Sequence, residues 1–181
     1  MIRALLLSLI VLYGCTRSLP ELDYPARQQA DARIELGIAY LQRGYYPKAY
    51  ESLSTALEVD PKYYRAQLAM ARYLDIVGEM TKAKHLYEYT LRTHPDNGNV
   101  LNNYGTFLCR QGKYQQALAL LLQATRLQDY YAIAESYENA GLCALKAGNS
   151  DQAWNYFERA LQHQPNRTST LIYLANLESE E

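Results

Sequence analysis

The side chains best suited to metal binding or nucleophilic catalysis are few in this sequence of 181 residues, and they lie far apart along it. No histidine falls at a spacing that would place it beside a cysteine or a second metal ligand, and there is neither a glycine-rich phosphate loop nor a nucleophile elbow. We therefore expect no metal site, no cofactor and no small-molecule substrate. The side chains concerned are Cys15, Cys109, Cys143, His85, His94 and His163.

A catalytic role would have to rest on an acidic pair such as Glu135 and Glu138. If this pair were catalytic, replacing one of its carboxylates would abolish turnover. A solvated helix face explains the pair better. The sequence thus predicts a protein that is not an enzyme. Nucleic acid is also excluded as a partner, because the chain has 18 basic and 19 acidic side chains, and no run of Lys or Arg is present.

Small residues recur along the chain at a period of 34 residues, which indicates an internal repeat. Small residues let two helix backbones pack closely, and a glycine between two apolar periodic segments predicts the end of the first helix. The three series are Gly37, Ala71 and Gly105; Gly44, Gly78 and Gly112; and Ala49, Ala83 and Ala117.

The period and the pattern resemble the tetratricopeptide helix-turn-helix unit, and this resemblance implies an all-α, right-handed superhelix. We expect four units, at residues 30–63, 64–97, 98–131 and 134–167, followed by a capping helix and acidic tail at 168–181. Gly148 follows Gly112 by 36 residues, so two residues are inserted in Asp129–Ile133 between the third and fourth units.

The amino terminus has the layout of a secretory signal peptide, with Arg3 before an apolar run that is too short to span a bilayer stably. The run ends in Leu-Tyr-Gly-Cys, which looks like a bacterial lipobox and implies lipidation of Cys15 after removal of residues 1–14. Thr16 in the next position implies transfer to the outer membrane, where the protein would face the periplasm on its lipid anchor alone. Residues 15–29 are then a lipidated tether. The alternative is an ordinary secreted protein whose Cys15 happens to follow glycine.

Cys109 and Cys143 remain after Cys15 is lipidated, and both lie on the first helices of adjacent units. Helix axes about 8–10 Å apart allow inward-facing Cα atoms within the roughly 7 Å that a disulfide needs, and the periplasm is oxidising. A disulfide between the third and fourth units is favoured over two buried thiols.

The first helices of the units are expected to line a concave groove that changes from apolar to polar along its length. Apolar side chains there would accept side chains of a peptide, and asparagine amides would pair with its backbone, unless the asparagines only bridge neighbouring helices. The predicted groove residues are Ile34, Ile38, Leu41, Leu68, Arg72, Asn99, Asn102, Asn103, Thr106, Arg110, Glu138, Asn139 and Leu142.

The combination of these repeats with the inserted segment and the lipobox cysteine resembles the PilF/PilW family of type IV pilus biogenesis lipoproteins, or pilotins. The resemblance covers residues 33–165 and rests on LNNYGTFLCRQGKY at 101–114, AGLCALKAGN at 140–149, the inserted segment and Cys15. It implies a scaffold that binds the outer-membrane secretin and promotes its assembly or placement. Family members usually continue into further repeats. An adaptor for a periplasmic protease or peptidoglycan hydrolase is the alternative.

Overall fold

The computed structural model describes residues 24–179, and every regular element within this part of the chain is an α-helix. The predicted signal peptide, Cys15 and the first part of the tether lie outside the described residues. No helix within residues 24–179 is long and apolar enough to cross a membrane. The helices are α1 Tyr24–Gln42, α2 Tyr46–Val59, α3 Tyr64–Ile76, α4 Met80–Thr93, α5 Gly98–Arg110, α6 Tyr114–Ala124, α7 Ile133–Lys146, α8 Ser150–His163 and α9 Thr168–Glu178.

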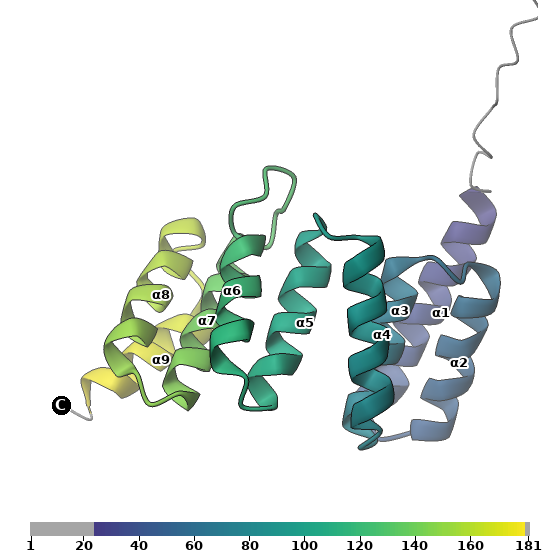
Figure 1. Cartoon of the computed structure of the whole chain (residues 1–181), viewed down its shortest axis with the longest axis horizontal. Coiled ribbons are helices and arrows are strands. Elements are labelled where there is room, and N and C mark those ends of the chain that lie inside the picture. Colours follow the sequence, from purple (N-terminus) through teal and green to yellow (C-terminus); the bar gives the residue numbers. More distant parts are fainter. Residues whose placement is uncertain (1–23, 180–181) are drawn as a thin grey trace, which may run out of the picture.

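Consecutive helices pack as antiparallel pairs, α1 with α2, α3 with α4, α5 with α6 and α7 with α8, and α9 covers the last pair (Figure 1). Each first helix also contacts the first helix of the next pair, so α1, α3, α5 and α7 form one layer. The predicted fold of four tetratricopeptide units and a capping helix is therefore confirmed.

Four glycines reverse the chain between the helices of each pair, as their spacing predicts. Gly44, Gly78, Gly112 and Gly148 have φ angles of 75°, 86°, 74° and 77°, a left-handed region that costs a residue with a Cβ about 1–2 kcal/mol. In each turn the amide after the glycine donates to a carbonyl five residues earlier, as Glu79 does to Leu74 at 2.8 Å. This bond pattern satisfies a free helix carbonyl and ends the first helix of the pair.

Helix α1 begins at Tyr24, six residues before the predicted start of the repeats, so the predicted tether is wrong for residues 24–29. Pro25 does not prevent this helix start, because a proline in the first helical turn removes no intrahelical hydrogen bond. The guanidinium of Arg27 lies 4.3 Å from the Tyr63 ring centre and 3.2 Å from an Asp60 carboxylate oxygen. These contacts hold the first turns of α1 against the end of the first unit.

The core is continuous because small residues bring the helices together and larger ones fill the space between units. Ala49, Ala83, Ala117 and Ala153 are fully buried, one on the second helix of each unit. One apolar cluster extends from α3 to α9 and a second joins α1, α2 and α3. Tyr64, with Leu74 and Leu86, packs against both clusters.

The inserted segment belongs to the loop between α6 and α7, which stands at the top of the view in Figure 1. Its Tyr130 is 6% exposed and packs with Leu101 and Ala124 in a small cluster of its own. The Tyr130 ring lies where a Cβ on Gly98 would be, only 2.3 Å from that position. The next residue, Tyr131, is 96% exposed.

Candidate functional site

Two hollows lie next to each other along the layer of first helices. The apolar hollow has a volume of about 190 Å³ and the polar hollow about 200 Å³, and Arg72 and Asn103 line both. Together they form one groove, which we call the first-helix groove. The apolar hollow is lined by Ile34, Ile38, Tyr64, Arg65, Leu68, Ala69, Arg72, Asn99 and Asn103. The polar hollow is lined by Arg72, Tyr87, Asn102, Asn103, Thr106, Arg110, Glu135 and Asn139.

Ten of the thirteen predicted groove residues line these hollows, because residues at helical spacing on packed first helices share one face. The apolar end is formed by Ile34 and Ile38 of α1 with Leu68 of α3. Ile34 and Leu68 are only 2% and 7% exposed, so they form a floor rather than a protruding patch. An aliphatic side chain of a bound segment would cover this floor and leave water.

Arg72 stands between the two hollows, and no carboxylate of residues 24–179 pairs with its guanidinium. The neighbouring arginines of the groove differ, since Arg65 pairs with Asp31 at 2.7 Å and Arg110 pairs with Asp75. A guanidinium with five donors and no acidic partner suits a carboxylate or a row of backbone carbonyls.

The polar hollow offers neutral donors and acceptors. Asn103 donates to the Asn99 carbonyl at 2.8 Å, and its Oδ1 has no partner within the described part of the chain. Tyr87 of α4, which is not among the predicted groove residues, also lines this hollow. Burial raises the pKa of Tyr87 to about 12, so its hydroxyl remains neutral at physiological pH. The neutral amide of Asn103 suits the backbone of an extended peptide, whereas Tyr87, only 1% exposed, forms part of the floor.

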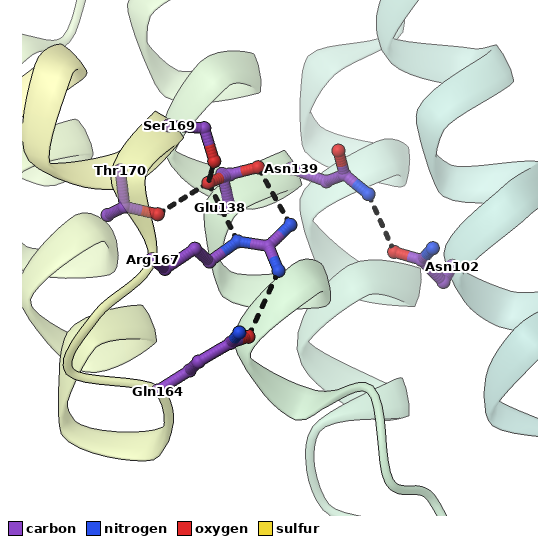
Figure 2. Close-up of polar contacts among 7 residues, drawn as sticks. All are labelled: Asn102, Glu138, Asn139, Gln164, Arg167, Ser169 and Thr170. Carbon is purple, nitrogen blue, oxygen red and sulfur yellow. Dashed lines mark hydrogen bonds and ion pairs between the residues drawn. The ribbon is translucent and has the colours of Figure 1, made fainter.

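The side chain of Asn102 forms hydrogen bonds between helices and is not available to a binding partner. It is 4% exposed, its Oδ1 accepts from Ser136 and from Asn139 at 3.0 Å each, and its Nδ2 donates to Glu135 at 3.3 Å. Figure 2 shows the Asn139 bond reaching across from α7 to α5. The helix-bridging alternative is therefore the correct one for Asn102, while Asn103 remains available at the surface of the groove.

Glu138 does not belong to the groove, contrary to the sequence-based prediction. Its carboxylate accepts two hydrogen bonds from Arg167, at 2.8 and 2.9 Å, and one each from Ser169 and Thr170 (Figure 2). Burial raises the pKa of Glu138, but these hydrogen bonds and the Arg167 charge outweigh burial and leave the pKa below its ordinary value. An ionised Glu138 thus attaches the capping helix α9 to α7.

Leu41 and Leu142 also lie away from the groove. Leu41 is 6% exposed, and Leu142 packs against the main apolar core. The prediction placed them in the groove because it treats the same places of every unit as equally exposed. In the structure, Leu41 is buried and Leu142 is partly buried against the core, and neither lines either hollow.

Cys109 of α5 and Cys143 of α7 form a disulfide, with their Cα atoms 5.7 Å apart. Cys109 is 7% exposed and Cys143 is fully buried. The bond joins the first helices of the third and fourth units. Among residues 24–179, no three His, Cys, Asp or Glu side chains come together as a metal site.

The comparisons with known proteins agree on a family. Residues 96–166 and 30–63 match models of the tetratricopeptide repeat. The type IV pilus assembly protein PilF of Pseudomonas aeruginosa is 35% identical over 182 aligned positions, which cover 97% of this chain and 72% of that protein.

Two solved structures support the same relationship. The structure of Pseudomonas aeruginosa PilF matches with a TM-score of 0.75 and 35% identity, covering 86% of this chain and 70% of that chain. The structure of PilW, a widely conserved type IV pilus biogenesis factor, matches with a TM-score of 0.74 and 28% identity, covering 84% of this chain and 70% of that one. By its sequence and its fold, the chain belongs to the PilF/PilW family of tetratricopeptide-repeat proteins.

Proposed function

We propose that this protein acts in type IV pilus biogenesis by binding an extended segment of the pilus secretin in the first-helix groove. The observation that carries the pilus role is the 35% identity to PilF over 97% of the chain. The groove supports a binding role because it joins an apolar floor, a guanidinium without an acidic partner and neutral amides in one continuous surface. A segment with an aliphatic residue followed by an acidic one fits this order.

The proposal includes the location of the protein. Lipidation at Cys15 would hold the superhelix at the periplasmic side of the outer membrane, where a secretin assembles. Two or more acyl chains, at about 0.8 kcal/mol per buried methylene, give a stable anchor. Labelling of the protein with a radioactive fatty acid, and loss of that label in Cys15→Ala, would test this part directly.

The groove is tested by complementation of a deletion strain. We expect the deletion to remove surface pili and secretin multimers, and the native chain to restore both. Ile38→Lys places a charge in the apolar hollow and Arg72→Glu reverses the charge between the hollows, so we expect neither variant to restore pili or to recover the secretin in a pull-down.

A matched control uses an apolar residue outside the groove. Ile172→Lys changes a side chain of α9 that is 54% exposed, and it should complement like the native chain. Pili and secretin multimers that survive the deletion unchanged would contradict the proposal. A periplasmic protease or peptidoglycan hydrolase as the main captured partner would instead favour the adaptor alternative.

A further inference from the structure

A third hollow lies outside the first-helix groove, on the helices α6 and α8 and the side of α7 between them. Its volume is about 550 Å³, larger than either part of the groove and within the range of about 300–1,000 Å³ typical of ligand sites. We call it the α6–α8 hollow. It is lined by Leu122, Thr125, Arg126, Tyr137, Asn149, Asp151, Gln152, Asn155, Tyr156 and Arg159.

Two guanidinium groups line this hollow without an acidic partner. Within residues 24–179, neither Arg126 nor Arg159 forms an ion pair with a carboxylate. Arg159 donates through Nε to Asn155 at 3.0 Å, which fixes its orientation and leaves its two terminal nitrogens for another acceptor. A guanidinium group binds a carboxylate or a phosphate through two parallel hydrogen bonds.

Tyr137 lies in the α6–α8 hollow beside the positively charged arginines. The Arg159 guanidinium carbon lies 5.8 Å from its ring centre, and His163 stacks on the ring at 5.7 Å. Burial raises the pKa of Tyr137, but the nearby Thr125 hydroxyl and Arg159 guanidinium, together with the positive charges of Arg159 and Arg126, outweigh burial and lower the pKa. The same field that favours a tyrosinate would favour a bound anion.

The lining points to an acidic peptide rather than to a small inorganic anion. Asp151, the one carboxylate in the lining, is eight residues before Arg159 on α8, or about 12 Å along the helix, and within residues 24–179 it forms no ion pair with either arginine. Between them lie the amides of Gln152 and Asn155, which offer donors and acceptors to a peptide backbone. A phosphate ion would fill only a small part of this volume.

We propose that the α6–α8 hollow is a second protein-binding site, which takes an acidic segment of a partner protein with its carboxylates on Arg126 and Arg159. This site lies on the second helices and is separate from the first-helix groove. It is therefore independent of the proposed secretin contact.

The test uses the lipid-free chain with Cys15 replaced by serine, and an N-acetylated, C-amidated tetraglutamate peptide in calorimetric titration at low ionic strength. We expect the peptide to bind and the double variant Arg126→Gln/Arg159→Gln to bind at least about tenfold more weakly, because two charged hydrogen-bond donors are lost. Arg33→Gln/Arg43→Gln removes the same charge from exposed positions of the first unit and should bind like the native chain.

Two further probes separate the possible sources of binding. The matching tetraglutamine peptide should not bind, and inorganic phosphate should not displace tetraglutamate at equal concentration. Equal affinity for both peptides, equal loss in the Arg33/Arg43 control, displacement by phosphate, or no heat of binding would each overturn the assignment. The groove variant Ile38→Lys should lose tetraglutamate affinity on the Arg126→Gln/Arg159→Gln change as the native chain does, so this result and the proposed function can fail separately.

Discussion

Single residues at equivalent places in the repeat decide how neighbouring units are joined. Asn102 accepts a hydrogen bond from Ser136, and Glu138, at the same place one unit later, accepts one from Thr170. At the first two junctions these places hold Ile34 with Ala66 and Leu68 with Val100, which are buried in apolar clusters. Each buried polar pair must stay complete, because an unsatisfied partner costs about 1–3 kcal/mol.

The Glu138 contacts make the stability of the capping helix depend on pH. Because the folded-state pKa lies below that of the unfolded chain, about 4.3, ionised Glu138 stabilises the fold above that pH. This contribution is lost as the pH falls through the folded-state pKa. Glu138→Gln should lower the free energy of urea unfolding by about 1–3 kcal/mol at neutral pH.

The pH series provides the control for this change. Between about pH 6 and pH 3, the native chain should lose more unfolding free energy than Glu138→Gln, which cannot titrate at this position. Parallel losses in the two proteins would show that Glu138 does not contribute through its charge.

Gly98 is a second residue whose role depends on a neighbour far along the sequence. A Cβ at this position would overlap the Tyr130 ring, so Gly98→Ala should destabilise the protein by about 1–3 kcal/mol in urea unfolding. Removing the ring leaves only the Tyr130 Cβ, 2.9 Å from the added methyl group, so most of the overlap is relieved and Gly98→Ala should cost less in a Tyr130→Ala background. Equal costs in the two backgrounds would contradict the contact.

At the residue scale, sequence reasoning succeeded where the cause is local. Positive φ at Gly44 follows from its place between two helical segments, and Gly148 has the same role. Sequence reasoning failed for Glu138, because the arginine and the hydroxyls that bind its carboxylate lie about one unit later in the sequence. The α6–α8 hollow was missed because its arginines lie at no shared place in the repeat.

At the scale of elements, the pairing of helices was predictable and their ends less so. The insertion identified by the longer glycine spacing forms the connection between α6 and α7. The first turns of α1 were not predicted, because residues 24–29 lack a helical period and are held by contacts of Arg27 with the end of the first unit.

The disulfide between α5 and α7 should stabilise the contact of the third and fourth units. For a separation of 34 residues, the chain-entropy model gives about 3–4 kcal/mol. In a chain with Cys15→Ser, we expect the further change Cys109→Ser/Cys143→Ser to lower the unfolding free energy by that amount. A reducing agent should destabilise the parent chain but leave the double serine variant unchanged. Maleimide labelling of both thiols in the oxidised, denatured parent would contradict the bond.

At the scale of the whole molecule, stacking brings together residues that are about one repeat apart in the sequence. The first-helix groove exists only because α1, α3, α5 and α7 lie side by side, so no single unit carries the site. The period alone predicted this layer and most of its lining. Which asparagines are free and which arginines lack acidic partners depends on contacts between units, and only the structure shows these.

Site-specific crosslinking tests the central claim most directly. The photoreactive residue p-benzoylphenylalanine would replace Asn99, which is exposed and lines the apolar hollow, and in a second strain Ile172, which is exposed on α9. We expect irradiation of living cells to join the secretin to the protein from Asn99 and not from Ile172. A secretin crosslink from Ile172 alone, or no crosslink to a pilus protein from Asn99, would contradict the groove as the binding site.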